Sequence, residues 1–272
     1  MKHLSPFNIT ALTLGFAFLY LPMILLVIYS FNASKLVTVW AGFSTKWYGE
    51  LLRDEAFLDA AWVTIKVAVM SSSLATVLGT MAAYVLVNSG RFFGRTLFSG
   101  MIYAPLVMPE VITGLSLLLL FIGIGLDRGV LTIVLAHTTF AMCYVSVVVS
   151  SRLVSFDRSL EEAALDLGCT RLEAFRLVTL PIIAPAVISG WLLAFTLSLD
   201  DLVIASFVSG PSSTTLPIKI WSAVRLGVSP EINALSTMMI GVVTIGVISA
   251  SLVSKRNSVR AQKDAQAAER TA

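Results

Sequence analysis

The chain has 272 residues, of which 57% are hydrophobic and only 13% are charged, and its mean hydropathy is +0.87. Soluble globular domains carry about 25% charged residues, so this composition argues against an ordinary soluble domain and indicates a membrane protein. The net charge of +3 is too small to favour a nucleic acid as partner.

Six apolar stretches are long enough to cross a bilayer, which takes about 20 apolar residues per helix. They are residues 9–31, 62–87, 97–123, 130–151, 182–208 and 235–253. The first belongs to a run of 31 uncharged residues with no small-residue cleavage pattern, which favours a retained signal-anchor. We expect an all-α membrane protein with six transmembrane helices, comprising a membrane domain over 1–254 and a charged tail over 255–272.

The distribution of Lys and Arg predicts the orientation, because cytoplasmic connections carry an excess of both. With the N- and C-termini cytoplasmic, twelve of these residues lie inside and six outside. The inner set is Lys2, Arg91, Arg95, Arg152, Arg158, Arg171, Arg176, Lys255, Arg256, Arg260, Lys263 and Arg270. The outer connection after the first span carries Trp40, Trp47 and Tyr48 and reads as an amphipathic segment on the membrane surface.

The inner connection 152–181 has the signals of two short helices. Ser159 precedes Glu162 by the spacing of a capping box, and Gly168 suits the position after a helix. A second short helix over 171–178 is expected to end before Pro181. The small pair Ala163 and Ala164 leaves a face that another protein can approach closely. The sequence alone leaves two interpretations open, a docking surface and a plain connector.

The stretch "EAALDLG", nine further residues and "VTLP" resembles the EAA loop of ABC importer permeases. The sequence departs from that pattern only at Val178, where the family has Ile. The resemblance implies that the loop docks an ATPase through residues of the first short helix, the turn after it and the end of the connection: Glu162, Ala163, Ala164, Gly168, Leu180 and Pro181. The dipeptide Gly-Lys is absent, so the chain has no phosphate-binding loop of the GxxxxGK[ST] type. ATP and magnesium are accordingly expected on a partner ATPase, with no cofactor in this chain.

The wider sequence, including "APLVMPEVITGLSLLLLF" and "SLDDLVIASFVSGPSSTTLPIKIWSAVRLGVSPEINAL", resembles the second permease subunit of putrescine and spermidine importers, most of all the putrescine type. The resemblance implies a type I ABC importer permease fold in a bacterial inner membrane, crossed several times. It also implies three kinds of partner: a second, homologous permease that forms a heterodimer, two copies of an ATPase, and a periplasmic polyamine-binding protein.

Ionisable residues inside the expected spans are candidates for the substrate path, because a charge at a helix centre costs about 2.5–3.5 kcal/mol on insertion scales. Glu110 follows Pro105 and Pro109, so the third span is expected to break there, with Glu110 in the first turn of the second half. Glu110 then serves the substrate path or caps that half-helix against its dipole.

Asp200 and Asp201 are adjacent, so on a helix their side chains diverge by about 100°. One is expected to face the path and the other to cap or pair, with Lys66 as a candidate partner, and the sequence does not say which. His137 reads as a hydrogen-bond partner between helices.

Three aromatic residues, Tyr103, Trp191 and Phe195, are candidates for flanking an ammonium group by cation–π contact. Aromatics at helical spacing also serve as plain packing. Two other functions stay open: a permease for another solute such as ferric iron, and an intramembrane aspartyl enzyme. No GxGD sequence surrounds Asp200, so we expect a non-catalytic subunit, without catalytic residues or a metal site.

Overall fold

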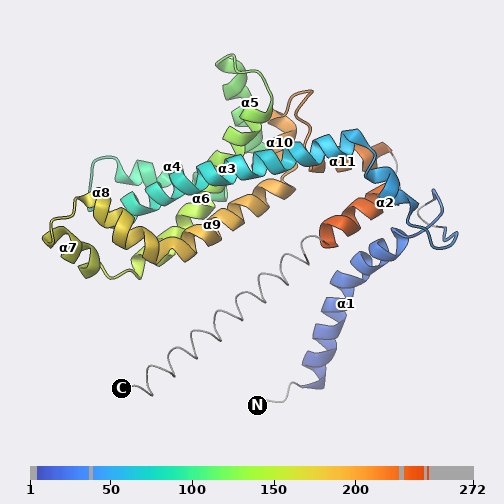
Figure 1. Cartoon of the computed structure of the whole chain (residues 1–272), viewed down its shortest axis with the longest axis horizontal. Coiled ribbons are helices and arrows are strands. Elements are labelled where there is room, and N and C mark those ends of the chain that lie inside the picture. The colour runs from blue at the N-terminus through green and yellow to red at the C-terminus, as the bar shows by residue number, and fades with distance from the viewer. Residues whose placement is uncertain (1–4, 37–38, 227–229, 242–243, 245–272) are drawn as a thin grey trace. The chain divides into compact units, whose positions relative to one another are not determined.

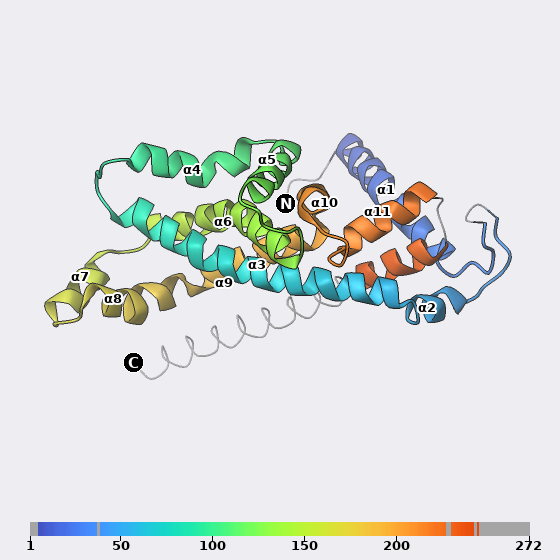
Figure 2. The same cartoon turned by 90° about the horizontal axis from the view of Figure 1, so that it is seen from above.

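The computed structural model describes residues 5–36, 39–226, 230–241 and 244. Within these residues every regular element is a helix, apart from one isolated antiparallel bridge between Asn32 and Phe43. The chain forms two compact units, Met1–Glu55 with Ser222–Ala272, and Ala56–Trp221. The fold is therefore all-α, as the composition predicted, and Figures 1 and 2 show its helices.

The first unit contains α1 (Pro6–Tyr29) and α2 (Lys46–Leu51). The Ser5 hydroxyl caps α1 by accepting from the backbone N–H of Asn8, and Pro6 occupies the first helical position, where no N–H is needed. Residues 230–241 are also helical. The predicted sixth span, 235–253, lies mostly outside the described residues, and the predicted tail, 255–272, lies wholly outside them.

The connection between α1 and α2 is folded around Asn32. Its side-chain amide donates to the Val39 carbonyl and its carbonyl oxygen accepts from the Ala41 N–H, while the Trp47 indole donates to the Asn32 backbone carbonyl at 2.7 Å. Trp47 is consequently buried, whereas Trp40 is exposed. The Trp47 indole N–H is thus satisfied inside the unit, and the place of this segment on the membrane surface stays a prediction.

The second unit begins one residue into α3 and ends within α11. Its elements are α3 (Glu55–Asn88), α4 (Arg95–Val107), α5 (Glu110–Gly123), α6 (Val130–Val154), α7 (Ser159–Asp166), α8 (Arg171–Ala174), the π-helical turn η1 (Phe175–Thr179), α9 (Leu180–Asp200), α10 (Val203–Val208) and α11 (Leu216–Leu226). The long helices α3, α6 and α9 run beside one another, and α7 and α8 form one end of the unit (Figures 1 and 2).

Small residues allow these long helices to approach α6 closely. A Cβ added at Gly79 of α3 would lie 2.7 Å from the Met142 carbonyl oxygen and 2.8 Å from the Val145 Cβ. A Cβ at Gly190 of α9 would lie 3.2 Å from the same Val145 side chain. Val145 is fully buried between them. Close contact between a small residue on one helix and the backbone of another is typical of helices in lipid, where the hydrophobic effect does not drive helices together.

Four helices of the described chain are long and apolar enough to cross a membrane, and a bent pair adds a fifth. Three predicted spans coincide with the candidate spans α1, α3 and α6, although α3 has 34 residues and a length of about 50 Å at 1.5 Å per residue. The predicted break in span 97–123 is confirmed, because α4 and α5 meet at Pro109 with a bend of 118°.

The prediction for span 182–208 is wrong at both ends. The helix-forming run extends from Arg171 and ends at Asp200, and a separate short helix, α10, follows.

Contrary to the prediction, the second short helix of the inner connection does not end before Pro181. The chain stays helical through η1, in which the Leu180 N–H reaches the Phe175 carbonyl. Pro181 is the second residue of α9 and closely follows this π-helical turn, so it lies within a helical run that continues from Arg171 to Asp200.

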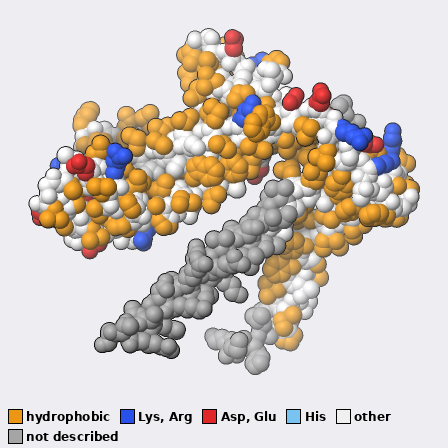
Figure 3. Space-filling model, viewed as in Figure 1, with side chains coloured by type: hydrophobic (Ala, Val, Ile, Leu, Met, Phe, Trp, Pro, Cys, Tyr) orange, Lys and Arg blue, Asp and Glu red, His pale blue; other side chains and the backbone are white. Residues whose placement is uncertain are grey.

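Hydrophobic side chains cover the long side of the second unit, and charged side chains gather at its α7–α8 end (Figure 3). This separation of apolar sides from charged ends is typical of a membrane-embedded bundle.

Candidate functional site

The first candidate site is the pair of short helices α7 and α8. The predicted capping box at Ser159 and Glu162 is wrong, because Ser159 is already helical and has no capping bond. Asp157 takes that role, accepting from the Ser159 N–H at 3.0 Å, and this hydrogen bond holds the pKa of the Asp157 carboxyl below its usual value. A capping box does form at the start of α8, between Thr170 and Glu173.

Gly168 ends α7 as the sequence predicted. Its φ of +94° is left-handed, the Cys169 N–H donates to the Ala164 carbonyl, and the Gly168 N–H donates to the Leu165 carbonyl. These two bonds form a Schellman motif, which requires a left-handed residue at this position. Gly168 therefore sets the angle at which the chain leaves α7 and enters α8.

Glu161 attaches the two short helices to the bundle. Its carboxylate accepts from the Tyr84 hydroxyl of α3 at 2.6 Å and from the Thr179 hydroxyl at 3.1 Å. The Tyr84 ring also packs edge-on against Phe175, with centroids 4.8 Å apart. The sequence analysis missed Glu161, and the signal available was only that it adjoins Glu162 at the start of an amphipathic helix.

Two arginines fix the same end of α3. Arg95 donates to the carbonyls of Leu86, Ser89 and Gly90, and Arg158 donates to the Val87 carbonyl at 2.6 Å. These carbonyls lie at or just past the C-terminus of α3, where intrahelical donors run out and a positive charge is favourable. The connections that carry Arg95 and Arg158 are thus held at one end of the unit.

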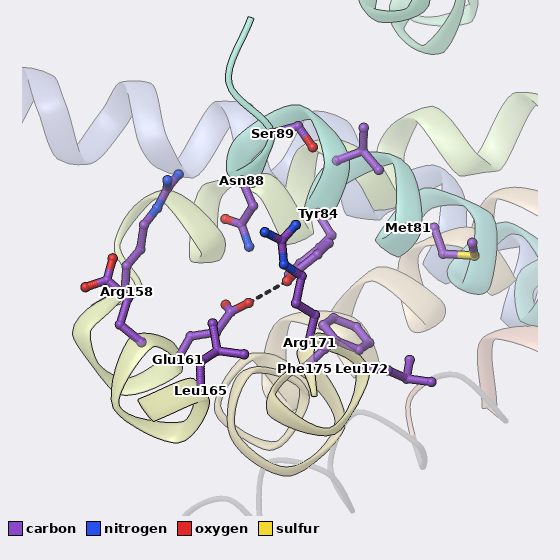
Figure 4. A pocket seen from close by; sticks show the side chains of 12 residues that line it. Met81, Tyr84, Asn88, Ser89, Arg158, Glu161, Leu165, Arg171, Leu172 and Phe175 are labelled. Carbon is purple, nitrogen blue, oxygen red and sulfur yellow. Dashed lines mark hydrogen bonds between the residues drawn. The ribbon is translucent and has the colours of Figure 1, made fainter. Parts of the chain in front are cut away.

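A groove of about 740 Å³ lies between α3 and the short helices. Tyr84 and Asn88 line it from α3, and Glu161, Arg171 and Phe175 from the inner connection, with the Tyr84–Glu161 hydrogen bond crossing it (Figure 4). Glu162 and Leu165 of α7 also line this groove.

The predicted coupling residues differ in their exposure. Glu162 and Ala163 are exposed, as a docking surface requires, whereas Ala164 is buried. Pro181 is exposed at the start of α9, and Leu180 packs against the core. Leu160 and Leu167 add apolar area on α7, with 47% and 87% of their surface exposed. An exposed apolar patch beside charges is typical of a protein interface.

The second candidate site surrounds the break between α9 and α10. Asp201 ends α9, and its carboxylate accepts from the backbone N–H groups of Ile204 and Ala205 at 3.2 and 2.7 Å. The same carboxylate lies 3.0 Å from the Nε2 atom of His137 on α6. Both side chains are buried, with exposed fractions of 8% and 3%. Asp201 is therefore the acid that caps and pairs, and its partner is His137.

Lys66, the partner suggested from the sequence, lies elsewhere. It is exposed on α3, with its ammonium 5.1 Å from the Trp62 ring centroid. The expectation that His137 bonds between helices is confirmed, because its Nδ1 atom lies 2.7 Å from the Ser198 hydroxyl of α9.

Asp200 and Glu110 are both exposed. Glu110 is the first residue of α5, as predicted from the break. A Cβ at Gly114, one turn later on α5, would lie 2.7 Å from the Phe207 ring and 3.3 Å from the Ile204 Cα on α10. The helix that begins at Glu110 therefore packs closely on α10, the short helix that follows Asp200 and Asp201.

The aromatic candidates are placed unequally. Trp191 and Phe195 stack with centroids 5.2 Å apart and nearly parallel rings, and the Trp191 indole donates to the Ser73 hydroxyl of α3 at 3.2 Å. Both are half-buried on the helix that ends in Asp200. Tyr103 is half-buried on α4, and the structure records no contact between it and this pair.

Comparisons with known proteins bear on both sites. The family model of the binding-protein-dependent transport system inner membrane component matches residues 75–261. The chain is 60% identical over 273 residues to the putrescine transport system permease protein PotI of Escherichia coli (strain K12), which covers 98% of this chain and 97% of that protein. It is 41% identical over 244 residues to the spermidine/putrescine transport system permease protein PotC of the same strain, covering 90% and 92%.

A solved structure supports the fold. The crystal structure of a bacterial ABC transporter involved in the import of the acidic polysaccharide alginate matches with a TM-score of 0.71, covering 92% of this chain and 99% of that one. The identity is only 18%, so this likeness concerns the arrangement of helices and not the substrate.

Proposed function

The chain belongs to the family of binding-protein-dependent transport system inner membrane components, and from this premise we propose that it is the permease subunit of a putrescine importer. It is a subunit of a bacterial inner-membrane ABC importer for polyamines and is not an enzyme. The observation that carries the substrate is the 60% identity to a putrescine permease over almost the whole length, against 41% to a spermidine/putrescine permease.

The proposed topology has six transmembrane helices with both termini in the cytoplasm. The five candidate spans of the described chain and the apolar sequence 235–253 supply the six crossings. The excess of Lys and Arg in the inner connections supports the orientation. The clustering of Arg95 and Arg158 at one end of α3 agrees with it, because both belong to connections assigned to the inside.

The proposed assembly contains a second, homologous permease, two copies of an ATPase and a periplasmic polyamine-binding protein. ATP and magnesium belong to the ATPase. In this chain Glu162, Ala163 and the apolar face of α7 contact the ATPase, while Gly168, Leu180 and Pro181 hold that face in position. The Glu161 contacts with Tyr84 and Thr179 provide a rigid route from the docking surface to α3 and α9.

The proposed substrate path uses the exposed acids Glu110 and Asp200, together with the Trp191–Phe195 stack on the helix that ends at Asp200. Putrescine carries two ammonium groups, whose hydration must be replaced inside an apolar bundle. Fixed carboxylates replace that hydration, and the cation offsets the cost of placing them in the membrane. Acids on two separate helices suit an elongated dication.

Uptake of labelled putrescine tests this proposal in cells that lack their own polyamine importers and express the complete transporter. Glu110→Gln and Asp200→Asn should each lower the uptake rate by about tenfold, since losing one charged contact of about 1.4 kcal/mol is a factor of ten. Asp127→Asn, which alters an exposed acid in the α5–α6 connection, is the matched control and should leave uptake unchanged.

Two results would overturn different parts of the proposal. Wild-type uptake by both acid variants, with normal ATPase co-purification, would make the carboxylates structural. Absence of putrescine uptake by the unaltered transporter would remove the substrate assignment itself.

A further inference from the structure

A continuous chain of polar side chains crosses the interior of the second unit. The Ser71 hydroxyl of α3 donates to the Ser198 hydroxyl of α9 at 3.1 Å, and the Ser198 oxygen lies 2.7 Å from the Nδ1 atom of His137. The Nε2 atom of His137 lies 3.0 Å from the Asp201 carboxylate. All four side chains are buried, so three long helices and the start of α10 are joined by polar contacts.

The Asp201 carboxylate favours one tautomer of the imidazole. Because a carboxylate can only accept, the Nε2 atom 3.0 Å from it is placed to carry the ring proton, which leaves Nδ1 to accept from the Ser198 hydroxyl at 2.7 Å. The approach of Nε2 to Asp201 is a close ion-pair distance and not an aligned hydrogen bond. The imidazole thus presents its N–H to a buried charge, in the way that a second hydrogen bond commonly sets the tautomer of a histidine.

Asp201 cannot serve as a substrate ligand in this arrangement. Its carboxylate is already occupied by the Ile204 and Ala205 N–H groups and faces His137, and only 8% of its side chain is exposed. Asp201 instead links α6 to the first turn of α10 and stabilises the break after α9. Asp200, the residue before it, is exposed at the last position of α9.

We propose that His137 is a positioning residue for transport: through Asp201 it fixes the break between α9 and α10, and the break presents the Asp200 carboxylate to the substrate path. The inference rests on the proposed function, because it gives Asp200 a role in moving the cation. It gives roles to His137, Ser198 and Ser71, none of which belongs to the EAA loop.

Two substitutions at His137 separate its two contacts. The amide nitrogen of Gln reaches the position of Nε2 and keeps a donor toward Asp201, whereas Asn reaches only the position of Nδ1 and keeps the contact with Ser198. His137→Gln should retain uptake to within about threefold. His137→Asn should lose about tenfold or more, because the Asp201 charge is left buried without its partner. Thr139→Val, which removes a hydroxyl bonded to Leu135 of its own helix, is the control on α6.

A double-mutant cycle tests whether His137 acts through Asp200. In an Asp200→Asn background, His137→Asn should add no further loss of uptake, because the carboxylate that it positions is gone. Losses that multiply, or equal activity of the Gln and Asn variants, would overturn the proposal. The complete transporter is used, and co-purification of the ATPase checks that each variant assembles.

A second measurement needs no substrate and therefore separates this inference from the proposed function. In a chain with Cys143 and Cys169 replaced by Ser, Asp200→Cys is labelled with a cationic methanethiosulfonate reagent in membranes. His137→Asn should change the labelling rate at position 200, and His137→Gln should leave it unchanged. Identical rates in all three chains would refute the positioning role, whatever the transported solute proves to be.

Discussion

Adjacent acids with opposite surroundings lie at the end of α9. Asp200 is exposed, whereas the Asp201 side chain is buried and accepts two backbone N–H groups. A buried carboxylate is tolerated only when it is hydrogen-bonded and paired, and Asp201 meets both conditions through α10 and His137. The same residue type therefore has a structural role at one position and is available to a ligand at the next.

This difference predicts unequal effects on stability. Asp201→Asn should lower the free energy of unfolding by about 1–3 kcal/mol. The amide carries no negative charge to pair with His137, and its NH₂ group would face either His137 or the backbone N–H groups of Ile204 and Ala205, which are themselves donors. Asp200→Asn should change it by no more than about 0.5 kcal/mol, as surface substitutions do. The midpoint of thermal unfolding of the detergent-solubilised protein measures both. Equal shifts would contradict the assignment of Asp201 as the buried partner.

Single-residue contacts were the least predictable part of the molecule. Divergence of the two aspartates and a hydrogen-bonding role for His137 follow from helical geometry, and both were predicted. The pairing of His137 with Asp201 was not, because it joins positions far apart in sequence and depends on how α6 packs against α9. Glu161 was missed for the same reason, since its hydrogen-bond partner Tyr84 lies on another helix.

Local sequence signals predicted the short helices α7 and α8 correctly only where one residue needs a specific backbone geometry. Gly168 was predicted at the end of α7 because a left-handed residue is needed there. The start of α7 was misplaced by one residue, because Asp157 and not Ser159 accepts a backbone N–H at the beginning of the helix. The continuous helix through Pro181 was not predicted, because the π-helical turn that precedes this proline has no distinctive sequence.

Gly168 and Gly90 provide a matched pair for testing the loop. A Cβ at either position would meet no atom within 4 Å, but only Gly168 has a left-handed φ. Gly168→Val should therefore cost about 1–2 kcal/mol of local strain, reorient α8 and reduce both putrescine uptake and ATPase co-purification. Gly90→Val should preserve both. The two variants are compared at equal amounts in the membrane, and equal co-purification of the ATPase would refute a role for the angle at Gly168.

At the scale of the whole chain, composition and apolar length predicted the class of protein and most of the spans. They did so because the bilayer imposes one requirement, a long helix with satisfied backbone groups, on every crossing. They could not place the end of α9, because the sequence stays uncharged through Leu199 and only the capping of α10 by Asp201 marks the break. Hydropathy therefore predicts that a segment crosses the membrane but not where its helix is interrupted.

The proposed topology can be tested by reporters at both ends of the second unit. Arg95 and Arg158 bind carbonyls at the end of α3, while Thr64, toward the other end of α3, accepts from the Leu216 N–H at 2.7 Å. Segments 89–94 and 211–221 therefore lie toward opposite ends of α3, and a membrane-spanning α3 puts them on opposite sides. A reporter in 211–229 should read as periplasmic, and reporters in 89–94 and after Arg260 as cytoplasmic.

A reporter in the α5–α6 connection is the control and should match the one in 211–229, because Thr132 of α6 donates to the Val208 carbonyl. Cytoplasmic labelling of 211–229, or periplasmic labelling after Arg260, would contradict the six-span arrangement.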